Sequence, residues 1–409
     1  MAVRRSSGDS AAAKVRTSDV IAFRLRAHHL GTRQPVADLH EVAGACAIQN
    51  SPPGSALLAL HARVDDVTSD LVDRLVHEEK SLLQTWCMRG APFYFPTVDA
   101  PVFTTGVLPA TEKARLHLII GVEQALTKLG LGLDEVVDII TREIGAVLSG
   151  RQLAINELGE ELAERVADTL SPGQRETWQR KGPYGANQPL GEAVVHFCIR
   201  MLTLRGVVCL TPRSANKAPF ALLAEWLGQP LPQVDPGSAR ADLLRRYLRC
   251  YGPSTRRDFA SWVGVHAGDV DPWWATIEDE IVPVEFDGNR AWILTDDLDA
   301  LRSTPPSRGV RLLPPRDPYT QMRDRDTIVD PKHHREVWKP VGEPGAVLAD
   351  GKITGIWRPR KSGRKLTLTI TTFHSLSAAL GKRLHEEAEH LAELRGASAV
   401  QIEFEDTTR

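Results

Sequence analysis

The chain has few cysteines, and their spacing argues against cross-linking by disulfides. Five cysteines occur among 409 residues, and no CxxC motif is present. An odd number of widely spaced cysteines does not make a disulfide framework. Most of them lie among apolar neighbours, so we expect buried free thiols in a reducing, cytoplasmic compartment. The cysteines are Cys46, Cys87, Cys198, Cys209 and Cys250.

Long apolar runs and several enzyme motifs are also absent. No run approaches the roughly 18 apolar residues of a membrane span, so we expect no membrane association. The patterns GxGxxG, GxxxxGK[ST] and GxSxG do not occur, which removes the main support for nucleotide binding and serine hydrolysis. Residues 1–19 are rich in serine, alanine and charge without an apolar signal core, which predicts a disordered tail.

The histidines do not predict a metal site. Two adjacent pairs occur, His28–His29 and His333–His334. Neighbouring residues of a helix point in different directions, so such a pair makes a poor two-point ligand. No HExxH or Cys/His framework accompanies them. Each pair has an arginine nearby, Arg26 or Arg335, which suits a phosphate-facing surface equally well.

A run of helices followed by two β-prone segments is the outline of a winged helix, and it recurs along the chain. Residues 20–110 contain such a run and end in a hairpin around Arg89–Gly90. Residues 111–235 form a looser, more helical copy, and residues 236–304 form the clearest one. Helices are predicted at 21–31, 36–48, 55–64, 66–83, 111–129, 133–149, 152–170, 191–204, 238–251 and 268–279.

The third unit contains a helix-turn-helix segment, STRRDFASWVG. Ser254 is the expected N-cap, and Arg256 and Arg257 near the helix start can reach phosphates or base edges. Paired arginines on a helix are also often only solvated. Asp287–Gly288 predicts a tight hairpin turn that ends this unit.

Residues 305–409 change in character and predict a small α+β unit. Three β-prone runs are separated by turns at Asp350–Gly351 and Ser362–Gly363. A helix at 375–396 and a last strand at 399–405 follow.

One segment of this unit carries a strong excess of positive charge, although the net charge of the chain is only −2. The segment is WRPRKSGRK, and its turn should place the charges at a hairpin tip. Each phosphate neutralised there would release counterions and make binding to nucleic acid depend on salt. Five positive side chains fall within eight residues: Arg358, Arg360, Lys361, Arg364 and Lys365.

An uncharged polar triplet, Gln49 to Ser51, separates two apolar runs in the segment ACAIQNSPPGSALLALHARV. Pro52, Pro53 and Gly54 follow it and would fix its direction. A glutamine at such a place is either a turn residue that satisfies backbone groups or a side chain held in position for chemistry. The residues alone leave both interpretations open.

Three blocks of the chain resemble the bacterial winged-helix DNA glycosylases of the azinomycin-resistance type. They are RLRAHHL together with the segment around Gln49, the stretch RLLPPRDPYTQMRDRDTIVDPKHHREVWKP, and GAVLADGKITGIWRPRKSGRKLTLTI. The resemblance implies an α+β fold of three tandem winged helices in a C-shape around a DNA channel, with a C-terminal β-rich element. It also implies a cofactor-free, monofunctional enzyme that acts on double-stranded DNA containing alkylated or crosslinked purines.

The resemblance further implies which residues act. The family's catalytic motif is a Gln-aliphatic-Gln triplet, and its closest match here is Ala47–Ile48–Gln49, with alanine at the first polar position. Gln49 is therefore the candidate catalytic residue, and a shifted register would give the role to Asn50 or Ser51. Asp317 is expected to fix a turn. The implied DNA-binding residues are Arg24, Arg26, Arg323, Arg325, His333, His334 and the five cations of the hairpin.

The implied chemistry suits a neutral side chain. An N7-alkylated guanine already carries positive charge, so its departure needs little acid catalysis. The enzyme then has to supply two things: a positioned water, and a dipole that stabilises the developing sugar cation. The alternative is a non-catalytic winged-helix DNA-binding protein, such as a transcriptional regulator, and the missing first glutamine of the motif favours it. Regulators of that kind usually dimerise, whereas three units in one chain favour a monomer.

Overall fold

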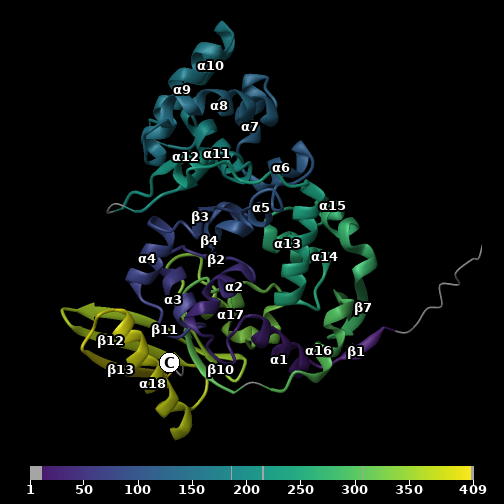
Figure 1. Ribbon diagram of the computed structural model, residues 1–409, viewed down its shortest axis with the longest axis vertical. Coiled ribbons are helices and arrows are strands. Elements are labelled where there is room, and N and C mark those ends of the chain that lie inside the picture. The colour runs from purple at the N-terminus through teal and green to yellow at the C-terminus, as the bar shows by residue number, and fades with distance from the viewer. Residues whose placement is uncertain (1–11, 186, 214–215, 307, 407–409) are drawn as a thin grey trace, which may run out of the picture.

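The computed structural model describes residues 12–185, 187–213, 216–306 and 308–406, which form a mixed α+β fold (Figure 1). Helices α8 to α11 lie at one end of the molecule, and the C-terminal sheet with α18 lies at the other. No described helix combines the length and apolar character that crossing a membrane requires.

The α-helices are α1 (Thr17–Ala27), α2 (Leu39–Gly44), α3 (Ser55–His61), α4 (Ser69–His77), α5 (Ala100–Phe103), α6 (Glu112–Leu118), α7 (Glu123–Leu129), α8 (Leu133–Leu148), α9 (Ile155–Thr169), α10 (Pro172–Gln179), α11 (Leu190–Leu204), α12 (Leu223–Leu227), α13 (Pro236–Tyr251), α14 (Arg256–Val263), α15 (Asp271–Trp274), α16 (Leu298–Ser303), α17 (His334–Val337) and α18 (Ala378–Leu394). Short 3-10 helices include η2 (Met88–Gly90), η5 (Ala275–Glu280) and η7 (Pro318–Gln321).

The strands form four sheets in the described part of the chain, with the orders β2-β4-β3, β5-β6, β1-β7-β8 and β13-β12-β11-β10-β9. The last of these is antiparallel except for the parallel β12–β13 pair. The strands are β1 (Ala13–Val15), β2 (Ile48–Gln49), β3 (Leu82–Trp86), β4 (Pro92–Pro96), β5 (Val208–Leu210), β6 (Phe220–Leu222), β7 (Ile281–Phe286), β8 (Asn289–Leu294), β9 (Val310–Leu313), β10 (Gly345–Ala349), β11 (Lys352–Ser362), β12 (Lys365–Thr372) and β13 (Ala399–Asp406).

Most predicted elements are present, and the hairpins at Arg89–Gly90, Asp287–Gly288, Asp350–Gly351 and Ser362–Gly363 are confirmed. Several helices are shorter than predicted. The helix expected at 111–129 is two helices, because Gly121 has a left-handed φ of 106° between them. The helix expected at 268–279 is only the four-residue α15 followed by η5.

Two local predictions near the termini of elements are corrected. The N-cap of α14 is Thr255, whose hydroxyl accepts a hydrogen bond from the backbone N–H of Asp258 at 3.1 Å, whereas the hydroxyl of Ser254 bonds that of Tyr247 at 2.7 Å. The predicted disordered tail of residues 1–19 lies largely outside the described residues, but its last part is ordered. Residues 13–15 form β1, which pairs in parallel with β7, and α1 begins at Thr17.

A buried ion pair joins the end of α3 to η7. Arg63 is 2% exposed and Asp317 is 1% exposed. Two guanidinium nitrogens of Arg63 donate to the two carboxylate oxygens of Asp317 at 2.6 and 2.7 Å. Asp317 also accepts a hydrogen bond from the backbone N–H of Tyr319 at 2.9 Å, so it fixes the turn into η7 as expected.

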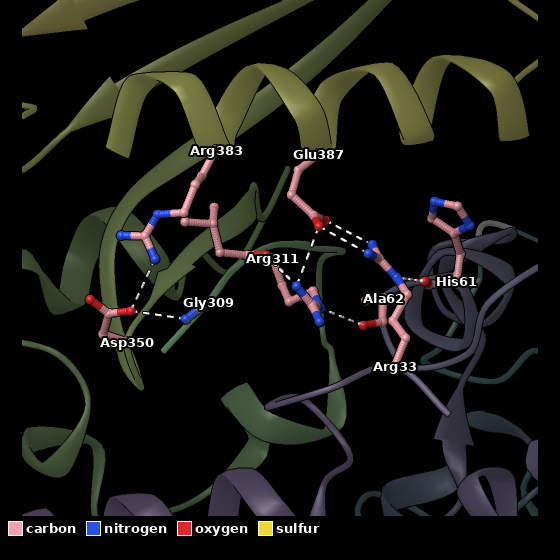
Figure 2. Close-up of polar contacts among 9 residues, drawn as sticks. Arg33, His61, Ala62, Gly309, Arg311, Asp350, Arg383 and Glu387 are labelled. Carbon is pink, nitrogen blue, oxygen red and sulfur yellow. Dashed lines mark hydrogen bonds and ion pairs between the residues drawn. The ribbon is translucent and has the colours of Figure 1, made fainter. Parts of the chain in front are cut away.

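A second set of ion contacts ties α18 to the same end of α3 (Figure 2). Glu387 on α18 accepts hydrogen bonds from Arg33 at 2.8 and 3.0 Å and from Arg311 on β9 at 3.3 Å. Arg33 and Arg311 also donate to the backbone carbonyls of His61 at 2.9 Å and Ala62 at 3.0 Å. These contacts therefore fix the position of the sheet that contains β11 and β12 relative to α3.

The Asp317→Asn variant should be strongly destabilised. It leaves the buried charge of Arg63 without its partner, which costs about 3–5 kcal/mol of unfolding free energy. Denaturant unfolding of the parent and the variant measures this loss. Asp330→Asn is the matched control, because Asp330 is the exposed N-cap of the 3-10 helix η9 (Pro331–His333), and asparagine caps about as well as aspartate, so little stability should be lost. Equal destabilisation by the two variants would contradict the assigned role of the ion pair.

Candidate active site and nucleic-acid interface

Gln49 lies in a short strand, not in a loop. Ile48 and Gln49 pair with Tyr94 and Phe93 of β4. The side chain of Ile48 belongs to the apolar cluster under α2, α3 and α4. Because successive side chains of a strand point to opposite faces, Gln49 is directed away from that cluster. It is nevertheless only 2% exposed, so it is held against other parts of the protein.

The side chain of Gln49 meets two residues from distant segments. Its Oε1 atom accepts a hydrogen bond from the Nη2 group of Arg89 at 3.2 Å. The same Nη2 group donates to Oε1 of Gln321 in η7 at 3.4 Å. Arg89 also donates through Nη1 to the backbone carbonyl of Trp262 in α14. The Nε2 atom of Gln49 is buried and has no partner among the described residues. One guanidinium thus places two amide side chains side by side.

The conformation of Arg89 depends on a glycine opposite it. Arg89 is half-buried at the tip of the β3–β4 hairpin, where its φ is 55°. Gly264, just after α14, has a φ of 105°, and a Cβ atom there would lie 3.0 Å from Cγ and 3.2 Å from Cα of Arg89. Burial, and then the nearby charge of Arg323, lowers the pKa of Arg89 to about 10. The guanidinium is therefore still charged at neutral pH.

Asn50 and Ser51, the alternative catalytic residues, are placed differently. The Oδ1 atom of Asn50 accepts hydrogen bonds from the backbone N–H groups of Gly54 at 2.9 Å and Ala56 at 3.3 Å. Asn50 is 6% exposed, and its amide oxygen caps the start of α3. Ser51 is half-buried, and its hydroxyl makes no hydrogen bond with a described residue. The contacts favour Gln49 as the residue that faces the site.

Three of the predicted DNA-binding residues come together in one groove. Arg323, Arg325 and His334 line a groove of about 840 Å³ together with Arg257 of α14. The Nε atom of Arg323 is buried without a partner among the described residues, and the guanidinium of Arg325 lies over the ring of Trp338 at 4.3 Å. Because α14 lines the same groove, the helix-turn-helix segment and the stretch after Asp317 share one surface.

Arg24 and His333 do not reach that surface, which corrects their assignment. Arg24 is 1% exposed, and its guanidinium donates to Asp324 at 2.7 Å and to the backbone carbonyls of residues 252 and 253. His333 is 7% exposed and stacks on Phe373 with ring centroids 4.0 Å apart. Both side chains stabilise the interior. Arg26 is exposed and lines a separate cavity of about 790 Å³.

The cations of the β11–β12 hairpin are exposed and divide between its two faces. Lys361 shares a face with Leu366 and Leu368, which pack against α18, and its Nζ donates to the backbone carbonyl of Arg395. Arg358 and Arg360 point to the opposite face. Arg358 donates to the carbonyl of residue 342 at 2.8 Å, and three cations form no ion pair with described residues: Arg360, Arg364 and Lys365.

A groove links the hairpin to the residues that follow Gln49. It has a volume of about 800 Å³, and its walls include Pro52 and Pro53 on one side and Arg358 and Lys361 on the other. The contact of Glu387 with Arg33 fixes the distance between these walls, because it connects the hairpin's sheet to α3. The positive side chains of Arg358 and Lys361 therefore line the same groove as the prolines that follow Gln49.

Sequence reasoning missed Arg89 and Gln321. Arg89 was recognised only as a turn residue, and Gln321 lies inside the DPYTQ segment without a charge to mark it. Arg89 is 40 residues from Gln49 and 232 residues from Gln321 along the chain. No spacing rule connects residues at such separations, so no local signal was available.

Comparisons with known proteins show the family to which the chain belongs. The sequence profile described as DNA glycosylase AlkZ-like matches residues 42–394. The chain belongs to the AlkZ-like DNA glycosylase family. It is an enzyme of that class, as the resemblance implies. The match begins in α2 and ends in α18, so it includes β2, η7 and the basic hairpin.

Two comparisons place the chain within the AlkZ-like family. It is 26% identical over 391 residues to the interstrand DNA cross-link repair glycosylase of Streptomyces sahachiroi, and the match covers 94% of this chain and 97% of that one. The solved structure of the Streptomyces sahachiroi DNA glycosylase AlkZ is similar, with a TM-score of 0.76 and 23% identity, covering 96% of this chain and 100% of that one. The structural likeness confirms the α+β fold.

Asn50→Ala should reduce stability because it removes the cap of α3. The expected loss of unfolding free energy is about 1–2 kcal/mol, and Asn50→Asp should restore most of it by returning the acceptor oxygen. Thermal unfolding of the three proteins measures the effect. An Asn50→Ala variant as stable as the parent would show that the cap is dispensable.

Proposed function

We propose that this glycosylase hydrolyses the N-glycosidic bond of bulky N7-alkylguanines or crosslinked purines in double-stranded DNA and leaves an abasic site. The role would be repair of such damage or self-resistance to a genotoxin that causes it. The observation that supports this most directly is that Arg89 holds the buried amide of Gln49 and the half-buried amide of Gln321 together. The similar Streptomyces sahachiroi protein is named as a repair glycosylase for interstrand cross-links.

The architecture we propose around the DNA has three winged-helix units. The first spans residues 20–110, the second 111–235 and the third 236–304, with the basic hairpin in the unit that follows. We propose that the units form a C-shaped channel, and that a single chain encloses the lesion without a second copy. Two features support this: each of these ranges contains an antiparallel strand pair, and each of two grooves is lined in part by arginine or lysine, one of them beside the prolines that follow Gln49.

The amide of Gln49 can orient a water molecule despite its contact with Arg89. An amide oxygen accepts two hydrogen bonds, and Arg89 supplies one of them. The second position is free for a water, which would then attack the anomeric carbon as the charged base departs. A neutral amide also places the negative end of its dipole near the developing sugar cation without attracting a counterion. The base leaves with the bonding electron pair, and the water loses its proton to solvent.

Gln321 compensates for the missing first glutamine of the motif in this proposal. Ala47 stands at that position, and its methyl side chain offers no polar atom. The backbone there is left-handed, with a φ of 59°. The Oε1 atoms of Gln321 and Gln49 both accept from Nη2 of Arg89, which brings a second amide to the site from η7. The buried pair of Arg63 and Asp317 fixes the start of η7 and hence the position of Gln321.

Gln49→Ala should abolish excision while leaving DNA affinity nearly unchanged. Removing one preorganised dipole typically costs about 100-fold to 1,000-fold in rate. A duplex with a single N7-alkylguanine, heated with mild alkali after incubation, reports excision as strand scission. Gln84→Ala is the matched control, because Gln84 is a buried glutamine of the same sheet that lies on β3. Scission by Gln49→Ala at the parent's rate would move the site elsewhere.

Gln321→Ala should slow excision about tenfold or more, equivalent to about 1.4 kcal/mol of barrier. The loss should fall on the single-turnover rate at saturating protein and not on binding, because Gln321 is assigned to the reacting sugar. The double variant with Gln49→Ala should be no slower than Gln49→Ala alone if the two amides hold one water. Additive losses would instead mean that the two residues act separately.

The double variant Arg358→Ala with Arg360→Ala should weaken binding to undamaged and damaged duplexes alike. Each lost phosphate contact should reduce the slope of log affinity against log salt by about 0.9. Lys382→Ala is the control, because Lys382 is an exposed cation of α18 that lines neither groove. Binding titrations at several salt concentrations measure both. An unchanged slope in the double variant, or an equal change with Lys382→Ala, would contradict the assignment of the hairpin.

A further inference from the structure

Three potential metal ligands meet behind the candidate active site. One ligand atom each from His28, Cys46 and Cys250 lies within 4.8 Å of the other two, and all three residues are buried. His28 follows α1, Cys46 lies between α2 and β2, and Cys250 is in the last turn of α13. Their separation along the chain explains why the spacing of the cysteines did not reveal the cluster.

The distances are close to those of a tetrahedral site. Zinc binds a thiolate at about 2.3 Å and an imidazole nitrogen at about 2.0 Å, so adjacent ligands of one ion lie about 3.5–3.8 Å apart. The Nδ1 atom of His28 is 4.0 Å from Sγ of Cys46. A shift of a few tenths of an ångström would complete the spacing. The Tyr251 and Tyr319 rings pack edge-on against His28 at 5.0 and 5.5 Å and keep the imidazole in place.

The polar atoms of the cluster face mainly one another. The Nδ1 atom of His28 faces Sγ of Cys46 at 4.0 Å. Outside the cluster, the thiol of Cys250 lies 3.5 Å from the carbonyl oxygen of Ala45 and 4.0 Å from that of Ala27. These long contacts leave much of the hydrogen-bonding capacity of three buried side chains unused, which is costly on burial. An ion bound between them would offset that cost.

The cluster has a path to solvent. The cavity of about 790 Å³ that Arg26 lines also has Ala27, Ala45 and Cys250 in its wall. These residues lie at or beside the three ligands. A hydrated ion can enter through this cavity, which also contains carboxylates such as that of Glu41.

We propose that His28, Cys46 and Cys250 bind one thiophilic divalent cation of the zinc class, with a water from the cavity as the fourth ligand. The ion would join α1 and α13 to the segment that begins at Cys46 and reaches Gln49 three residues later. Binding displaces the thiol protons, so two protons are released for each ion bound and the ion's charge is balanced by two thiolates.

The test uses the full-length protein, stripped with a chelator under reducing conditions and titrated with Co²⁺. The parent should bind one equivalent and show the absorption band of a cobalt–thiolate bond, and Zn²⁺ should then displace the band. Cys46→Ala and Cys250→Ala should lose the band and bind at least 100-fold more weakly. Cys198→Ala is the matched control, because Cys198 is a buried cysteine of α11, and it should behave like the parent.

A thiol measurement on the parent keeps the test independent of how the variants fold. Bound Zn²⁺ should protect two thiols from alkylation, and tryptic mass spectrometry should identify them as Cys46 and Cys250. The absence of a cobalt–thiolate band in the parent would overturn the proposal. A cobalt–thiolate band that persists in Cys46→Ala would also overturn it. The same holds if the parent forms a Cys46–Cys250 disulfide, detected as a loss of two hydrogens in mass, instead of binding the metal.

Discussion

The guanidinium of Arg89 joins three segments that are far apart in the chain. It contacts the amide of Gln49 in β2, the amide of Gln321 in η7 and the end of α14. Each contact constrains a different part of the protein, and the flat guanidinium imposes one geometry on all of them. The left-handed turn at Arg89 and the glycine at position 264 both serve this one placement. The position of the candidate active site follows from it.

Helix α3 provides the frame around that guanidinium. Its first residues are capped by Asn50, one residue after Gln49, and the residues at its end contact Arg33 and Asp317. The two ion contacts at this end are costly to bury, and they stabilise only because both partners and their remaining hydrogen bonds are satisfied. These contacts fix the positions of two parts of the protein relative to α3. One part is η7, and the other is the C-terminal sheet with α18.

Much of the fold could be predicted from the sequence, because its signals are local. The long helices follow apolar periodicity, and the hairpins follow turn residues such as Asp287–Gly288. The strand of Ile48 and Gln49 could not be predicted, because two residues show no periodicity and its start depends on a left-handed turn at Ala47. The burial of Arg24 depends on partners 228 to 300 residues away, and a charged residue type suggests the surface instead.

The β3–β4 hairpin has its tip turned into the protein. Arg89 at the tip contacts α14, and Gly90 lies against the side chain of Arg200 in α11, where a Cβ atom would be 3.1 Å from Cδ and Nε of that arginine. Because the tip of this hairpin packs against α11 and α14, it cannot insert into a groove of DNA. Any contact between this enzyme and the grooves of DNA must therefore come from elements other than the β3–β4 hairpin.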